Sequence, residues 1–399
     1  MSDRSWLYIA VSVRSLATGM MGVLLGLYLA ELRLGADAIG VIVAVGLGGA
    51  AVATLLVTLF ADRIGHRRTL LLVTLASFVG ALLLSFSTHP LALGFAALVG
   101  MVNGMGRDRG AALVVEQAAL PATTTDRERT MVFAKYNVLQ DIGHALGALL
   151  AGLPTLLQHG GVGALPAFRG TAALYALLSL LPVLAYWRLS PGVEAPRVTR
   201  AQQVSPDTRR ILWRISSLFA LDSVAGGFLT TALLSFFFHR RFGVGVETIG
   251  LLFFAARIAN AASHIGAAWL ARRIGLVNTM VFTHIPSSLL LATVPFMLSF
   301  PVAAALFLAR EGLVEMDVPT RQSYVMAVVR PEERAFASGV THLVRLAGWA
   351  IAPAIAGYWM GGGHLALPLV IGAAMKVVYD LLLWRAFRRV RPPEEIRTN

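Results

Sequence analysis

Twelve apolar stretches, each long enough to cross a lipid bilayer, occupy most of this chain. A membrane-spanning helix needs about 20 mostly apolar residues, and only helices or closed barrels satisfy the backbone inside lipid. Windows of that size lie at about 7–30, 39–60, 69–88, 91–119, 131–156, 167–187, 211–238, 246–270, 277–298, 300–327, 335–360 and 364–387. The sequence therefore predicts an all-α integral membrane protein with twelve transmembrane helices. The first stretch is too long for the apolar part of a signal peptide, so we expect it to be the first span.

Composition separates this chain from soluble proteins. Hydrophobic residues make up 57% of it and charged residues 14%, whereas about a quarter of a typical soluble domain is charged. A net charge of +13 would suggest nucleic-acid binding in a soluble domain, but here it is expected from loop arginines that set orientation and meet anionic lipids. Because the chain has no cysteine, disulfides and thiolate metal sites are excluded. We expect contact with membrane lipids and no nucleic-acid partner.

Arginine is concentrated in alternate loops, which predicts the orientation of the chain in the membrane. The arginine-rich loops and tail contain Arg63, Arg67, Arg68, Arg127, Arg129, Arg188, Arg197, Arg200, Arg209, Arg210, Arg272, Arg273, Arg330, Arg334, Arg385, Arg388, Arg389, Arg391 and Arg397. The opposite loops contain only Arg33, Arg169, Arg240 and Arg241. Both termini are therefore expected in the cytoplasm, with the protein in the plasma (bacterial inner) membrane. The polar, proline-containing segment 188–210 is expected to link two six-helix halves, 1–187 and 211–399.

A short basic turn occurs once in each half. The segment 59–68 reads Leu-Phe-Ala-Asp-Arg-Ile-Gly-His-Arg-Arg, and 270–275 reads Leu-Ala-Arg-Arg-Ile-Gly. A second pair of charged segments, 126–129 and 331–334, follows the fourth and tenth spans. Internal repeats of this kind are typical of secondary transporters, whose substrate site lies near the bilayer midplane where the repeats meet.

With this turn and twelve spans, the sequence resembles the major facilitator superfamily. The family pattern between spans 2 and 3 is Gly-x-Leu-Ala-Asp-Arg-x-Gly-Arg-Arg, from which Thr58 and Phe60 depart. The residues that fit it, with one further base, are Ala61, Asp62, Arg63, Gly65, Arg67 and Arg68. Glycines and prolines at 143–154 and 348–357 also resemble a motif of exporters in this family, although helix packing explains them nearly as well.

The resemblance implies roles for two sets of residues. Asp62, Arg63, Gly65, Arg67 and Arg68 would form a conformational latch, in which the aspartate meets the start of span 11 near 333–336. Spans 1, 4, 7 and 10 would line a central cavity, while spans 3, 6, 9 and 12 would face lipid. Spans 3 and 6 indeed carry no interior charge, span 9 carries only His284, and span 12 only Lys376 and Asp380.

Buried charges provide the candidate substrate and coupling site, because an ionisable residue in the membrane is costly and often functional. The candidates are Arg14, Arg107, Asp108, Arg109, Asp141, His144, Asp222, Arg257, Arg310, Glu311, Glu315 and Asp317. In a continuous span 4, Arg109 and Glu116 would share a helix face and Arg107 would lie on the opposite side. Some of these charges could instead pair with one another and fix the packing, above all Arg107, Glu116 and Arg321.

The leading hypothesis is a proton-driven exporter of a small organic solute. Arginines in the first half suggest an anionic or zwitterionic substrate. Arginine does not deprotonate in proteins, so proton carriers must be carboxylates or histidines, and we place Asp222 and Glu311 first. No hydrolase, nucleotide-binding or metalloprotease motif is present, so we expect no catalytic activity, no cofactor and no metal. We also expect a monomer.

Two alternatives remain on the same fold. One is a proton-coupled uptake symporter. The other is a lipid or lysolipid translocase, which the large aromatic residues near the charges would suit: Phe219, Phe228, Trp269 and Trp349.

Overall fold

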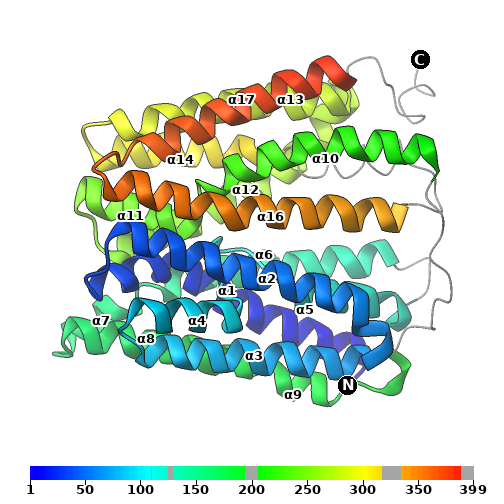
Figure 1. The fold of residues 1–399 in the computed structure, drawn as a ribbon, viewed down its shortest axis with the longest axis horizontal. Coiled ribbons are helices and arrows are strands. Elements are labelled where there is room, and N and C mark those ends of the chain that lie inside the picture. The colour runs from blue at the N-terminus through cyan, green and yellow to red at the C-terminus, as the bar shows by residue number, and fades with distance from the viewer. Residues whose placement is uncertain (109, 125–128, 194–204, 317–333, 388–399) are drawn as a thin grey trace. The chain divides into compact units, whose positions relative to one another are not determined.

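The computed structural model describes residues 1–108, 110–124, 129–193, 205–316 and 334–387, and all regular secondary structure in these ranges is helical (Figure 1). The helices of the first half are α1 (Asp3–Glu31), α2 (Ala36–Ile64), α3 (His66–Phe86), α4 (Pro90–Gly100), α5 (Ala111–Ala119), α6 (Arg129–Leu150), α7 (Leu153–His159), α8 (Ala164–Leu180) and α9 (Pro182–Trp187). Those of the second half are α10 (Pro206–Gly227), α11 (Thr231–Phe242), α12 (Val246–Ile274), α13 (Leu276–Thr293), α14 (Phe300–Val314), α16 (Arg334–Gly361) and α17 (Leu367–Phe387).

Nine helical stretches in the described residues are long and apolar enough to cross a membrane. They coincide with nine of the predicted spans, the sixth being α8 with α9 and the seventh α10 with α11. The other three predicted spans contain shorter or more polar helices. The fourth contains α4 and α5, the fifth contains α6, and the tenth contains α14. The prediction of an all-α transmembrane protein is confirmed.

The described helices form two compact units. Unit 1 comprises Met1–Thr199, Thr230–Phe254 and Pro353–Gly362, and unit 2 comprises Arg200–Leu229, Ala255–Ala352 and Gly363–Asn399. Helices α12 and α16 contribute one part to each unit. Unit 1 thus contains the whole of the first sequence half together with short pieces of the second. The predicted halves 1–187 and 211–399, joined by 188–210, stay a prediction about the repeat.

The repeated basic turn has the same local structure in both halves. Gly65 separates α2 from α3 with φ of 98°, and Gly275 separates α12 from α13 with φ of 85°. Only glycine adopts these values readily. The hydroxyl of Thr69 donates to the Gly65 carbonyl at 2.9 Å, and that of Thr279 donates to the Gly275 carbonyl at 2.8 Å. The sequence repeat is therefore also a structural one.

Glycines allow the main contact of unit 1, between α1 and α6. A Cβ at Gly147 would lie 2.1 Å from the Leu16 carbonyl oxygen, and one at Gly19 would lie 2.3 Å from the His144 carbonyl oxygen. Helices that approach this closely need residues without a side chain. In unit 2, Gly348 meets α10 in the same way, with its Cβ position 2.6 Å from the Cβ of Ser223. The glycines of the exporter-like motif therefore pack helices.

This packing leads to a first prediction on stability. Gly147→Ala is expected to destabilise the protein by about 1–3 kcal/mol, because the methyl group collides with backbone that cannot move aside. Gly48, in α2, is the matched control, since its Cβ position has nothing within 4 Å. Gly48→Ala is expected to leave stability unchanged or raise it by about 0.5–1 kcal/mol. Thermal unfolding of both variants in detergent checks this, and an equal loss in both would contradict the packing role of Gly147.

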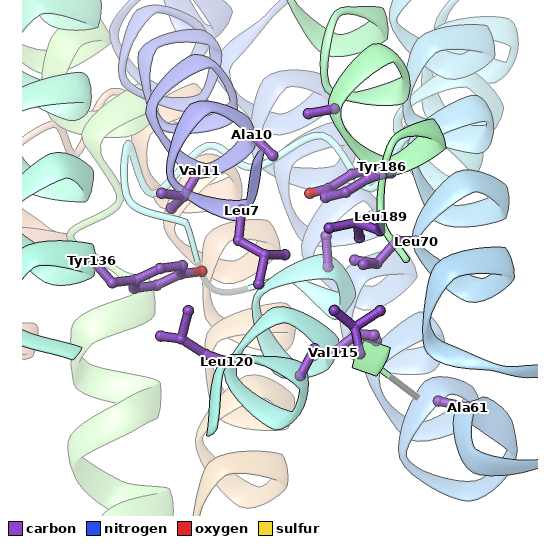
Figure 2. Close-up of a cluster of buried hydrophobic side chains, with 14 of the residues drawn as sticks. Leu7, Ala10, Val11, Ala61, Leu70, Val115, Leu120, Tyr136, Tyr186 and Leu189 are labelled. Carbon is purple, nitrogen blue, oxygen red and sulfur yellow. The ribbon is translucent and has the colours of Figure 1, made fainter. Parts of the chain in front are cut away.

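A buried apolar cluster in unit 1 includes two tyrosines (Figure 2). Its helical members come from α1, α2, α3, α5, α6 and α9, with Leu7 of α1 among them at 0% exposure. Tyr136 of α6 and Tyr186 of α9 lie on two sides of the cluster, also at 0% exposure (Figure 2). A buried tyrosine hydroxyl needs a hydrogen-bond partner, and both hydroxyls find theirs in the charged cluster described next.

Candidate substrate and coupling site

The fourth span is interrupted, and the interruption carries candidate charges. Helix α4 ends at Gly100 and α5 begins at Ala111, so they appear as separate coils (Figure 1). Between them the chain reads Met-Val-Asn-Gly-Met-Gly-Arg-Asp-Arg-Gly, with φ of 50° at Met101 and 65° at Gly106. The prediction of one continuous helix over 91–119 is wrong, because these glycines disfavour helix and allow left-handed turns. The sequence also predicted Arg107 on the side of that helix opposite to Arg109 and Glu116. That prediction assumed a continuous helix, so it no longer applies.

The non-helical backbone of this segment is hydrogen-bonded within unit 1. The side chain of Asn103 accepts from the Met105 N–H at 2.8 Å and donates to the Arg107 carbonyl. The Gly104 carbonyl accepts from the Ala232 N–H at 2.9 Å, and the Thr231 hydroxyl donates to the Met105 carbonyl at 2.7 Å. Irregular backbone at membrane depth is tolerated where it is buried in protein or lines a cavity. Interrupted helices of this kind often build the binding sites of transporters.

Arg14 of α1 is the centre of a charged cluster in unit 1. Its Nε donates to Asp108, while Nη1 and Nη2 donate to the two oxygens of Glu116 at 2.6 and 2.7 Å. The hydroxyls of Tyr136 and Tyr186 each donate to one Glu116 oxygen at 2.5 Å. The side chain of Glu116 is 0% exposed and that of Arg14 is 14% exposed. Each Glu116 oxygen thus receives one guanidinium and one phenol hydrogen, and this carboxylate is satisfied by the protein itself.

Asp108 is held differently from Glu116. One of its oxygens meets the Arg14 Nε, and the other accepts from the Gly110 N–H at 3.2 Å. The Asp108 N–H donates to Nε2 of His144 at 2.9 Å. A ring nitrogen that accepts a hydrogen bond carries no proton, so His144 is neutral in this arrangement. Arg14 therefore makes one hydrogen bond to Asp108 in addition to the two that pair it with Glu116.

A cavity of about 60 Å³ lies beside this pair within unit 1. That volume accommodates about four water molecules. Its polar lining comes from several helices and from the interrupted segment, and comprises Arg14, Thr18, Thr74, Ser77, Asn103, Asp108, Tyr175 and Ser179. Among the described residues that line this cavity, Arg14 and Asp108 are the charged ones.

Three further candidates come from the first half. Arg107 and Asp141 are partly exposed, and Arg109 lies outside the described residues. Glu116, which the sequence named among the charges that could pair within the protein, belongs to the cluster. The two tyrosines were missed, although a tyrosine within an apolar span is a sign of a polar partner nearby.

In unit 2, α14 contributes a buried ion pair of consecutive residues. Arg310 contacts Glu311, and Glu311 accepts from the Asn260 side chain of α12 at 2.9 Å. The three residues are 8%, 7% and 3% exposed. Arg257 and Glu315 are partly exposed, while Asp317, Arg321 and the side chain of His264 lie outside the described residues.

Asp222 of α10 belongs to a second buried group in unit 2. One Asp222 oxygen accepts from Lys376 Nζ of α17 at 2.8 Å, and the other lies 3.7 Å from Arg345 of α16. Lys376 in turn lies 3.4 Å from Nε2 of His284. The sequence does not predict Lys376 and His284 to belong to the site, because the family resemblance places their spans against lipid.

The latch remains a prediction. Gly65 has the turn conformation described above, Arg63 and Arg68 are exposed, and the Arg67 guanidinium lies 5.7 Å from the centre of the Trp187 ring. The side chains of Asp62 and of 333–336 lie outside the described residues. Among the described residues, no group of three or more His, Cys, Asp or Glu side chains is arranged to hold a metal ion.

Known proteins resemble this chain over nearly its whole length. It is 24% identical to the uncharacterized membrane protein YJR124C of Saccharomyces cerevisiae, over 96% of this chain and 93% of that protein. The crystal structure of the nucleoside transporter NupG superposes with a TM-score of 0.76 at 14% identity, covering 97% of this chain and 100% of that one. The human organic anion transporter MFSD10 gives 0.62 at 16% identity, covering 95% and 98%.

At such low identities these structures support the fold alone. The sequence profile of the Major Facilitator Superfamily matches residues 7–353. That match covers most of the twelve predicted spans, including the interrupted fourth span and the first basic turn. The chain belongs to the Major Facilitator Superfamily of membrane transporters.

Proposed function

We propose that this protein is a proton-coupled exporter of a small zwitterionic or anionic organic solute in the bacterial inner membrane. The observation that carries the proposal is the Arg14–Asp108 pair, which faces a small polar cavity at the interruption of the fourth span. The pair presents one cation and one anion side by side. A solute with a carboxylate and an ammonium group would replace the single Arg14–Asp108 hydrogen bond with two of its own.

The geometry favours a zwitterion over a simple anion. Glu116 already neutralises Arg14 through two hydrogen bonds, so Arg14 with Asp108 and Glu116 carries one net negative charge. A solute that supplied only an anion would leave Asp108 buried without its partner, which is costly. A solute that also supplies a cation pairs Asp108 again. Binding of a simple anion would require additional positive charge at the site, from Arg107 and Arg109.

The lipid-translocase alternative depends on four aromatic residues, none of which the proposed site uses. Phe219, Phe228 and Trp349 are 4%, 3% and 3% exposed and pack inside unit 2. Trp269 is 51% exposed, and its ring lies 4.4 Å from the Arg273 guanidinium. None of these four aromatic residues lines the cavity beside Arg14. The uptake symporter differs from the exporter only in direction and is separated from it by experiment.

Inverted membrane vesicles that are acidified inside, with a fluorescent reporter of the pH gradient, test the proposal. One amino-acid scaffold is added as its zwitterion, its N-acetyl anion and its trimethylammonium ester cation, and the series is repeated for several scaffolds. We expect zwitterions to dissipate the gradient in vesicles with the protein and not in vesicles without it. A response to cations alone, or a response only in right-side-out vesicles acidified outside, would overturn the substrate class or the direction.

Asp108→Asn is expected to abolish this response, because an amide cannot bind the ammonium group as an ion pair. Glu31→Gln is the matched control, since Glu31 is exposed at the end of the same helix that carries Arg14. We expect the control to respond as the wild type does. An unchanged response in Asp108→Asn would remove the Arg14–Asp108 pair from the substrate site.

A further inference from the structure

Four ionisable side chains of unit 2 form one continuous chain of contacts. Asp222 Oδ1 accepts from Lys376 Nζ at 2.8 Å, and Lys376 Nζ lies 3.4 Å from His284 Nε2. On the other side of the imidazole ring, His284 Nδ1 lies 2.9 Å from an oxygen of Asp380. The residues come from three helices, α10, α13 and α17. No step in the chain is longer than a weak hydrogen bond.

The chain is buried on the inner side of α17. Asp222, His284, Lys376 and Asp380 are 3%, 1%, 7% and 1% exposed. The opposite side of α17 is exposed and apolar, with Val378 at 49% and Leu381 at 54%. An ionisable side chain within a membrane is costly to bury and is usually functional. A pair of charges would be sufficient to hold α10 against α17, but this group contains four ionisable residues.

The hydrogen-bond chemistry allows a proton to pass along the whole chain. An imidazole nitrogen beside a carboxylate carries its proton, so Nδ1 donates to Asp380 while Nε2 accepts from Lys376. A proton that arrives on Asp222 moves to Lys376 as Lys376 gives one of its own to Nε2. The ring then releases its Nδ1 proton to Asp380. Lys376 ends as an ammonium group, His284 as the other neutral tautomer, and one proton has moved from Asp222 to Asp380.

The depths of the residues give this movement a direction. Asp222 lies more than four turns from the start of α10, and Lys376 three turns from the end of α17. Asp380 lies only two turns from the end of α17, and His284 just over two turns from the start of α13. Those helix ends adjoin the basic turn at Gly275 and the arginine-rich tail. The chain therefore leads from the middle of the membrane towards the predicted cytoplasmic surface.

Two further groups touch the chain from neighbouring positions. Arg345 of α16 lies 3.7 Å from Asp222, so the two carboxylates face two cations when His284 is neutral. The ring of Tyr379 meets the ring of His284 edge-on, with 6.2 Å between their centres. The group is therefore electrically balanced at rest, and it carries one net positive charge while a proton passes through it.

From these contacts we propose that Asp222, Lys376, His284 and Asp380 form a proton relay that connects the interior of unit 2 with the cytoplasm. This proposal rests on the proposed proton coupling and specifies the residues through which the proton passes. It assigns a role to His284, Lys376 and Asp380 and places Asp222 at the inner end. Substrate is not part of the relay, so protons enter and leave it whether or not a solute is bound.

The experiment measures proton binding without any solute. Purified protein is reconstituted into liposomes on a solid-supported membrane, and the transient charge movement is recorded after a pH jump. We expect the wild type to give a transient that protein-free liposomes lack. His284→Gln and Asp380→Asn keep hydrogen-bonding groups in place but interrupt the relay, and each is expected to lose most of the charge movement. Asp37→Asn, at an exposed position in the first turn of α2, is expected to retain it.

Transients of wild-type size in both relay variants would overturn the relay. Nitrogen-15 NMR of the labelled wild type gives a second reading that needs no folded variant. A relay moves the ring proton of His284 between Nδ1 and Nε2, and a ring spectrum that shows one unchanging tautomer before and after the pH jump would show a static pair. Failure of the vesicle panel would remove the proposed solute transport while leaving this transient intact, so the two proposals fail separately.

Discussion

Glu116→Ala is expected to remove most of the folded protein from the membrane. The substitution removes both hydrogen bonds from Arg14 to Glu116 and leaves Arg14 with Asp108 and the hydroxyls of two tyrosines, Tyr136 and Tyr186. Breaking a buried ion pair from one side costs about 3–5 kcal/mol. The hydroxyls of Tyr136 and Tyr186 also lose their acceptor, at about 1–3 kcal/mol for each buried group left unpaired. Yield after extraction and thermal unfolding in detergent measure the loss.

Two further variants show whether the ion pair is the cause. Tyr136→Phe removes one hydroxyl and is expected to cost about 1 kcal/mol. Arg14→Met, Asp108→Asn and Glu116→Met together remove all three charges of the cluster. This triple variant is expected to recover more than half of the stability lost in Glu116→Ala, because no charge is left stranded. It should not transport, since Arg14 is gone. A triple variant as unstable as Glu116→Ala would show that Glu116 acts through packing alone.

The features that could be predicted from the sequence depend on short stretches of chain. A run of about 20 apolar residues is sufficient to predict a span, and the glycine turns at Gly65 and Gly275 recur with the same conformation because the local sequence recurs. The selection of Arg14 and Asp108 as candidates also followed from one rule, that charges are rare inside the membrane. The cavity shared by the two halves stays a prediction from the repeat.

The features that could not be predicted depend on contacts between distant residues. Arg14 and Glu116 are 102 positions apart, and their pairing depends on how α1 rotates against α5. The interruption of the fourth span was hidden because its apolar length suits a helix, although four glycines between 100 and 110 were a sign of it. Lys376 and Asp380 were not predicted as site residues, because the family resemblance implies that span 12 faces lipid. Their spacing of four residues placed both on one helix face and could have indicated the relay.

The second large effect is expected at Gly106, where the interrupted span meets α11. Gly106 has φ of 65°, and a Cβ there would lie 2.9 Å from the Thr231 hydroxyl oxygen. Valine at this position suffers both from the left-handed backbone, at about 1–3 kcal/mol, and from the collision. We therefore expect Gly106→Val to break the Thr231 and Ala232 hydrogen bonds to this segment, and to reduce transport about tenfold, since about 1.4 kcal/mol shifts an equilibrium tenfold.

Labelling shows whether the loss at Gly106 follows from separation of α11. The chain contains no cysteine, so a single Ser235→Cys substitution reports on α11, where Ser235 is 0% exposed. A membrane-impermeant thiol reagent should leave this cysteine unmodified in the otherwise wild-type protein and modify it when Gly106→Val is added. Gly110→Ala is the matched control in the same segment, because its backbone suits any residue and its Cβ position meets only Asp108, at 3.7 Å. Lost transport with Ser235→Cys still shielded would mean that Gly106 acts on the Arg14–Asp108 pair and not on α11.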